Sequence, residues 1–160
     1  MDALEHGFRL EADLARVMAA AGDGPGGDPG RAGVLGQLRG DHPAGRLCLG
    51  RGRAGLAERR AAAHESVRLA HAAGVLLGAG TDFGGGWLRA NQLPWEGATL
   101  VAAGLEPYDA LAAATVNGGR LLGEPGAGVL AQGGPADFLL VHGDPLTDPG
   151  SLWRVWRTSW

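Results

Sequence analysis

The chain has 160 residues, 45% of them hydrophobic, and a formal net charge of −3 with acidic and basic residues mixed along it. These values are typical of one globular domain, and they exclude a disordered chain and a strongly basic binder of nucleic acid or membrane surfaces. No apolar run reaches the ~18 residues of a membrane-spanning helix, the first residues lack the layout of a signal peptide, and the single Cys48 excludes an internal disulfide. We therefore expect a cytoplasmic protein with neither nucleic acid nor membrane as a partner.

The first third of the chain predicts one helix and then a long irregular segment. Apolar residues at helical spacing predict a helix that ends near Ala21, and they are Leu10, Leu14, Val17 and Met18. Glycine and proline are frequent from Gly22 to Gly55, so this segment is predicted to be irregular or disordered. Its short apolar pieces, Val34-Leu35 and Leu47-Cys48-Leu49, are expected to be too isolated to nucleate a core.

A helix and a buried strand follow. Residues 57–73 are rich in good helix formers, and Ala63, Val67 and Ala70 share one face of this helix. A continuous apolar run over 75–81 then predicts a strand buried on both faces, and it ends on Asp82. In barrel enzymes the chemistry sits at this end of a strand. The residues alone favour the alternative that Asp82 only caps a turn before the glycines that follow it.

The last third predicts two helices and several strands. The helices are expected over 95–103 and from Pro107 towards Leu122, because proline suits a first helical turn. Short strands are expected at Val129–Leu130 and over 136–142. Residues 152–157 alternate apolar and basic side chains and predict an edge strand or a docking segment, and three of the five tryptophans lie beyond residue 152.

Three parts of the sequence together resemble the C-terminal end of the amidohydrolase superfamily, in its imidazolonepropionase and prolidase-like branch. The tail carries Asn117-Gly118-Gly119-Arg120-Leu121-Leu122-Gly123 and then Ala136-Asp137-Phe138-Leu139-Leu140-Val141. Gly80-Thr81-Asp82 resembles the family's metal-site aspartate at the end of barrel strand eight, and Leu4-Glu5-His6-Gly7 resembles its histidine at the end of strand six. The similarity covers about residues 2–21 and 57–156.

The resemblance implies an α/β fold, the last third of a TIM-like (β/α)₈ barrel over 1–122, followed by strands of a small β-sandwich over 123–160. It also implies one or two divalent metals, zinc above all, and a small-molecule amide, peptide or cyclic amide substrate. His6 and Asp82 would be metal ligands, and Asp82 would also accept a proton from the hydrolytic water. Trp87, Arg89 and Asn91 follow the glycine-rich loop and would line the substrate pocket, with plain loop packing as the alternative.

The sequence also departs from the family pattern. It contains no His-X-His pair and no lysine, both of which supply metal ligands in the family. A barrel of this type needs roughly 250 residues, and the glycines of 22–30 stand where strand seven is expected. We therefore expect an incomplete chain, with a shifted reading frame over about 22–55 as one explanation. Its partners would be a second copy or a complementing N-terminal chain, and the alternative function is a non-catalytic interaction module.

The other histidines carry weaker signals. His64 and His71 lie seven residues apart on one predicted helix, which is too far for the usual metal-binding pair one turn apart, so surface or packing roles are expected. His42 and His142 are expected to face solvent. The glycines of 84–86 are not a phosphate loop, because no Gly-Lys-Ser/Thr follows them.

Overall fold

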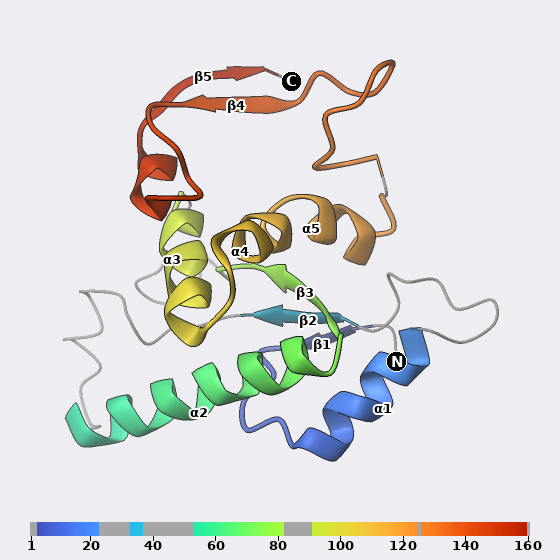
Figure 1. Ribbon diagram of the computed structural model, residues 1–160, viewed down its shortest axis with the longest axis vertical. Coiled ribbons are helices and arrows are strands. Elements are labelled where there is room, and N and C mark those ends of the chain that lie inside the picture. Colours follow the sequence, from blue (N-terminus) through green and yellow to red (C-terminus); the bar gives the residue numbers. More distant parts are fainter. Residues whose placement is uncertain (1–2, 23–32, 37–52, 82–90, 125, 160) are drawn as a thin grey trace.

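Figure 1 shows a computed structural model that describes residues 3–22, 33–36, 53–81, 91–124 and 126–159. The first half of the chain alternates strands and helices. Its elements are β1 (Ala3–Glu5), α1 (Ala12–Gly22), β2 (Gly33–Gly36), α2 (Arg53–Ala72) and β3 (Leu76–Ala79). This alternation is the α/β order that the sequence predicts.

The three strands form a parallel sheet in the order β1-β2-β3. Ala3 pairs with Gly33, which in turn pairs with Leu76, and the register continues to Gly36 beside Ala79. Because the strands are parallel, their carboxyl ends lie at one edge of the sheet. The chain segments that follow β1 and β3 therefore begin side by side.

Strand β2 corrects the prediction for residues 22–55. Val34 and Leu35 lie in the central strand of the sheet, so this part of the segment has regular structure, and a strand does follow α1. The sequence does not predict this strand, because it has only four residues and two of them are glycine. A central strand makes ladder hydrogen bonds on both sides, and these offset the weak local preference. Residues 23–32 and 37–52 lie outside the described part.

Helices α1 and α2 run beneath the sheet in Figure 1 and contact each other. The predicted buried face of α2 is confirmed, since Ala63, Val67 and Ala70 are all buried. On α1 the predicted face is wrong in part, because Ala15 is buried while Leu14 and Val17 are 49% and 65% exposed. Small side chains thus line the buried faces of the two helices, which contact each other, and α2 also contacts β3.

The helices of the second half are α3 (Leu93–Ala103), α4 (Pro107–Ala113) and α5 (Val116–Leu121). In Figure 1 α4 and α5 lie above the sheet and α3 stands at its left side, and all three contact β3. The single helix predicted from Pro107 to Leu122 is thus two helices separated by two residues. The core unites both halves of the chain, and its buried apolar residues are Leu10, Ala15, Ala63, Val67, Ala70, Val75, Leu77, Leu100, Ala103, Leu105, Ala110 and Ala113.

Helices α2 and α3 end in the same way. Gly74 and Gly104 have φ angles of 81° and 112°, a left-handed conformation that suits glycine. The next residue in each case returns its N–H to a carbonyl five positions back, from Val75 to Ala70 and from Leu105 to Leu100. This Schellman arrangement satisfies the last carbonyls of each helix, and it confirms both predicted helix ends.

The tail forms a two-stranded antiparallel ribbon. Its elements are β4 (Phe138–Val141), the 3₁₀ helix η2 (Pro149–Trp153) and β5 (Val155–Ser159). The strand predicted over 136–142 is confirmed as β4. The edge strand predicted over 152–157 is confirmed only from Val155 onward, because Leu152 and Trp153 belong to η2. The strand predicted at Val129–Leu130 is wrong, because these residues have no regular structure and Leu130 is exposed.

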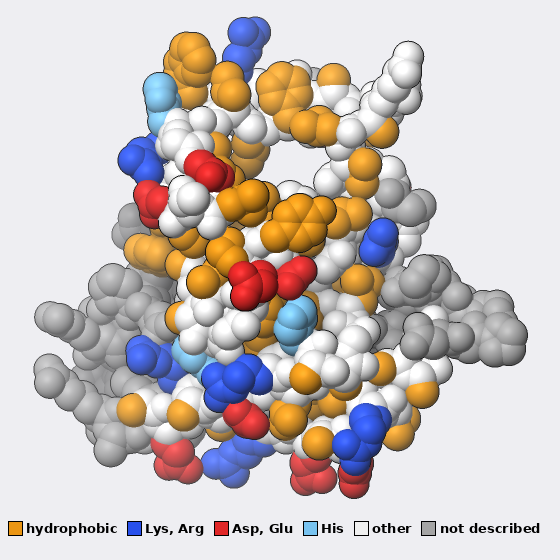
Figure 2. Space-filling view, viewed as in Figure 1, with side chains coloured by type: hydrophobic (Ala, Val, Ile, Leu, Met, Phe, Trp, Pro, Cys, Tyr) orange, Lys and Arg blue, Asp and Glu red, His pale blue; other side chains and the backbone are white. Residues whose placement is uncertain are grey.

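Element η2 fastens the ribbon to the helices. Trp153 packs edge-on against Trp95 of α3, with ring centroids 4.8 Å apart. Hydrophobic side chains gather over the ribbon at the top of Figure 2. Among the described residues no helix is both long and apolar enough to cross a membrane.

Candidate functional site

The candidate site lies at the carboxyl edge of the parallel sheet. His6 directly follows β1, and Glu5 is in register with Leu35 and, across β2, with Gly78. Neighbouring strands lie about 4.8 Å apart, so β1 and β3 are separated by about 10 Å. The chain beyond β3 continues through Gly80 to Thr81, the last described residue before Asp82. The sheet thus brings His6 and the start of the Asp82 segment to one edge.

His6 occupies a tight turn. The Gly7 N–H donates to the Glu5 carbonyl at 2.9 Å, which closes a three-residue γ-turn around His6. The φ angle of His6 is 68°, a left-handed value that costs a residue with a side chain on the order of 1–3 kcal/mol. The turn directs the chain away from the sheet immediately after the strand. The imidazole is therefore exposed at the sheet edge.

The loop after His6 is fixed to helix α2. The buried N–H of Leu10 donates to the Ser66 hydroxyl at 2.9 Å, and that hydroxyl donates to the Ala62 carbonyl. Arg9, which also has a positive φ angle of 57°, forms an ion pair of 3.6 Å with Glu58. Helix α2 thus holds this loop in place at two separate points.

The other predicted site residues are only partly placed. Asn91 is exposed, has a φ angle of 69° and directly precedes the buried Gln92 at the start of α3. Asp82, Trp87 and Arg89 lie outside the described residues. Within the described ranges, no three His, Cys, Asp or Glu side chains are close enough to hold a metal ion together. The three non-glycine residues with positive φ among those described are His6, Arg9 and Asn91.

Asn117 holds β3 from the side of α5. Its Nδ2 donates to the Leu77 carbonyl at 2.9 Å, which satisfies a buried backbone acceptor in the strand that leads to Asp82. In the sequence Asn117 belongs to the motif that resembles the family, and no separate role is predicted for it. An asparagine followed by two glycines gives no local signal of a partner forty residues away.

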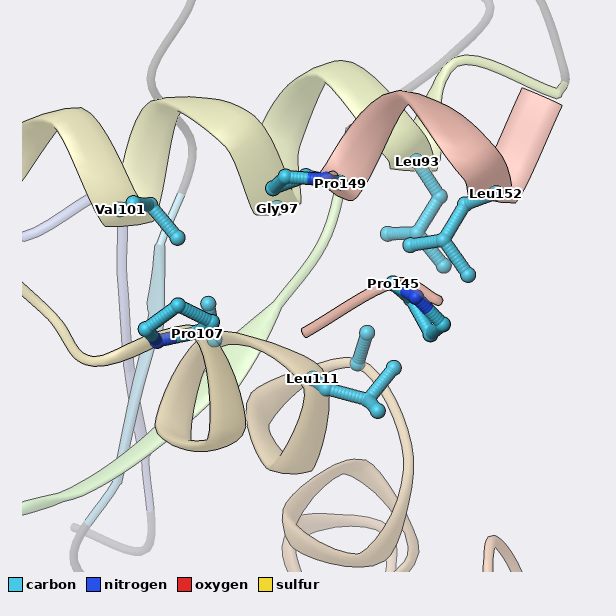
Figure 3. Close-up of a pocket in the computed structure, with 10 residues that line it drawn as sticks. Leu93, Gly97, Val101, Pro107, Leu111, Pro145, Pro149 and Leu152 are labelled. Carbon is cyan, nitrogen blue, oxygen red and sulfur yellow. The ribbon is translucent and has the colours of Figure 1, made fainter. Parts of the chain in front are cut away.

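An apolar pocket lies elsewhere, between α3, α4 and the segment that leads into η2 (Figure 3). Leu93 and Leu152 approach each other across it, with Pro145 and Leu111 beside them. No lining residue carries a charge or a nucleophile. This pocket serves the packing of the tail on the helices and has no groups for hydrolytic chemistry.

Comparison with protein families identifies the class of this chain. The sequence model of the amidohydrolase family matches residues 53–156, which is more than half of the chain. The chain therefore belongs to the amidohydrolase family. No curated protein sequence matches it.

Solved structures agree with this assignment. An amidohydrolase is 26% identical with a TM-score of 0.75, covering 99% of this chain and 38% of that chain. A Bifidobacterium longum protein assigned as a prolidase is also 26% identical, with a TM-score of 0.77 and coverages of 99% and 40%. A Xaa-Pro dipeptidase with bound methionine, at 22% identity and a TM-score of 0.77, covers 97% and 37% and shows the same fold. The chain spans about two fifths of the length of these structures.

Proposed function

We propose that this chain forms part of a metal-dependent hydrolase that cleaves a carbon–nitrogen bond in an amide, a peptide or a cyclic amide. The observation that carries the proposal is the parallel register, which sets His6 and the segment leading to Asp82 at one sheet edge. Membership of the amidohydrolase family supports the reaction class. Similarity to the Bifidobacterium longum protein makes Xaa-Pro dipeptides the first substrates to test.

In this proposal His6 and Asp82 would hold a divalent metal, with zinc as the first candidate, and Asp82 would accept a proton from the attacking water. Imidazole nitrogen and carboxylate oxygen both suit zinc. Two ligands fall short of the three protein ligands typical of catalytic zinc. The edge strands β1 and β3 each have a neighbour on one side only among the described strands. We propose that a complementing barrel segment pairs with these edges and supplies the remaining ligands.

The substrate would lie over the same sheet edge. Asn91 is exposed and held in a left-handed conformation, so its amide is available to a ligand. Trp87 and Arg89 complete the proposed substrate-binding set, and the arginine would suit a substrate carboxylate. The proposed division of the chain is a barrel part over 1–122 and sandwich strands over 123–160.

A second candidate function is a non-catalytic interaction module. The exposed apolar side chains of the β4–β5 ribbon favour it, since Leu139 and Trp156 are 61% and 71% exposed. This function requires neither His6 nor Asp82. The two candidates therefore differ in whether these two residues bind metal.

Zinc titration of the isolated chain, followed by NMR of its histidine signals, separates the two functions. We expect weak binding that perturbs His6 and is abolished by His6→Gln and by Asp82→Asn, because two ligands hold zinc less firmly than three. The control His142→Gln changes an exposed histidine near Trp156 and leaves the affinity unchanged. We expect no hydrolysis of Xaa-Pro dipeptides by the chain alone. Zinc binding that is equal in all variants contradicts the metal role and favours the interaction module.

A further inference from the structure

The ring of Phe8 links His6 to helix α2. The imidazole of His6 stacks on the Phe8 ring with 6.4 Å between centroids and 21° between planes. The guanidinium of Arg59, on α2, lies 5.7 Å from the centroid of the same ring. Three side chains from two segments that are far apart in sequence thus form one contact series at the sheet edge.

This contact explains an exposed aromatic residue. Phe8 is 41% exposed, so burial in the core does not account for its position. A cation is attracted to the face of an aromatic ring, and Arg59 therefore holds Phe8 against the first part of α2. The adjacent Arg9–Glu58 ion pair joins the same loop to α2 through two side chains that are not part of this contact series.

The contact also acts on an exposed side chain. His6 is exposed, and its backbone is held in the strained γ-turn described above. The turn sets the position of the Cα atom but leaves the imidazole free to rotate about its side-chain bonds. A metal-binding imidazole needs its ring orientation fixed by neighbouring groups. Phe8 offers the flat surface that limits this rotation.

We propose that Phe8, held by Arg59, is a positioning residue that fixes the orientation of the His6 imidazole at the sheet edge. Only the purpose of this orientation rests on the proposed function. That purpose is to present a ring nitrogen to the metal. The stacking itself is a property of the chain without metal.

NMR of the His6 ring protons at constant pH tests the stacking directly. A ring stacked on Phe8 has signals displaced by the aromatic ring current, and His6→Gln identifies these signals. We expect Phe8→Leu to remove the displacement and Phe8→Tyr to keep it. Arg59→Gln weakens it, whereas Arg59→Lys retains a cation and preserves most of it. Glu58→Gln is the matched control, because it removes the neighbouring ion pair and leaves the rings in place.

Zinc titration of the same variants tests the purpose of the orientation. We expect Phe8→Leu to raise the zinc dissociation constant by about 10-fold, the lower end of the effect of residues that orient metal-binding histidines. Phe8→Tyr and Glu58→Gln leave it near the wild-type value. Circular dichroism confirms that each variant is folded, as expected for changes at exposed side chains.

The outcomes distinguish the positioning of His6 by Phe8 from the metal-binding role of His6. His6 signals that are unchanged in Phe8→Leu overturn the positioning role, and so does a Glu58→Gln variant that loses the displacement as fully as Phe8→Leu. A wild-type chain with displaced His6 signals that do not respond to zinc supports the positioning of His6 and overturns its metal role in the proposed function.

Discussion

Gly119 and Gly128 lie where two stretches of backbone touch. A Cβ atom on Gly119 would lie 2.4 Å from the Ala127 carbonyl oxygen, and one on Gly128 would lie 2.4 Å from the Thr115 carbonyl carbon. Both distances are well inside van der Waals contact. The chain after α5 thus rests directly on the backbone of that helix, and only glycine permits this approach.

We therefore expect Gly119→Ala and Gly128→Ala to lower the free energy of unfolding by about 1–3 kcal/mol, the usual cost of overpacking. Gly128 also has a φ of 72°, so its substitution is the more costly of the two. Gly126→Ala is the control, because nothing lies within 4 Å of its added Cβ. Urea unfolding followed by circular dichroism measures the difference. Equal stability of all three variants would falsify the close backbone contact.

The hydrogen bond from Asn117 to the Leu77 carbonyl gives a second prediction about a single residue. Asn117→Ala leaves a buried carbonyl without its donor and is expected to destabilise the chain by about 1–3 kcal/mol. Asn117→Asp keeps the shape but places a carboxylate oxygen against the Leu77 oxygen, so we expect it to be at least as destabilising at neutral pH. Faster amide exchange in β3 reports the loss. An Asp variant as stable as wild type contradicts the hydrogen bond.

At the residue scale the sequence predicts the location of His6 but not its surroundings. His6 lies in Leu4-Glu5-His6-Gly7, which resembles the family's histidine at the end of a strand. The contacts of Phe8 with Arg59 and of Leu10 with Ser66 join residues about fifty positions apart. No local pattern encodes such pairs, because they exist only once α2 packs against the loop that follows β1.

At the scale of elements, the predictions succeed where a local signal and burial agree. Helices α2 and α3 have good helix formers, an apolar face and a terminal glycine in the left-handed region. Strand β2 has only Val34 and Leu35 between glycines, and its stability comes from partners on both sides. Val129–Leu130 has the same apolar content but no partner strand, so it forms none. Whether a short apolar segment forms a strand therefore depends on the strands available to pair with it.

The central position of β2 can be tested with proline. Leu35→Pro removes an N–H from the sheet and is expected to destabilise the chain by about 1–3 kcal/mol and to speed amide exchange in both β1 and β3. Leu130→Pro is the control in an exposed segment without regular structure. If Leu35→Pro is no worse than Leu130→Pro, β2 does not connect the two strands. Slow exchange is expected at Val34 and Leu35, in contrast to the irregular or disordered structure that the sequence predicts for the whole segment from Gly22 to Gly55.

At the scale of the whole molecule, the described part of the chain has two exposed apolar surfaces. One is the outer side of α1, with Leu14 and Val17, and the other is the β4–β5 ribbon. Both edges of the ribbon lack a neighbouring strand among the described elements. Exposed strand edges beside apolar side chains favour association. The α/β class follows from the order of elements, whereas the closed barrel and the sandwich stay predictions, because they need strands beyond those described.

We expect the isolated chain to form oligomers at tens of micromolar, measured by light scattering. The double variant Leu139→Glu, Trp156→Glu places charges on the ribbon and should shift the population towards monomer. Leu122→Glu is the control, since Leu122 is 77% exposed at the end of α5 and outside the ribbon. A wild-type chain that is a monodisperse monomer contradicts the expectation, and so does a double variant that associates as strongly as the control.

The parallel pairing has a consequence for how fast the molecule forms. Every rung of the β1-β2-β3 ladder joins residues that are tens of positions apart, whereas the ribbon closes within the last part of the chain. Hairpins close in about 1–10 μs, but pairings between distant residues first require the closure of long loops, which slows folding by orders of magnitude. We therefore expect the sheet edge that carries His6 to assemble last, after the helices and the ribbon. Refolding followed at His6 and at Trp156 should show the ribbon signal first.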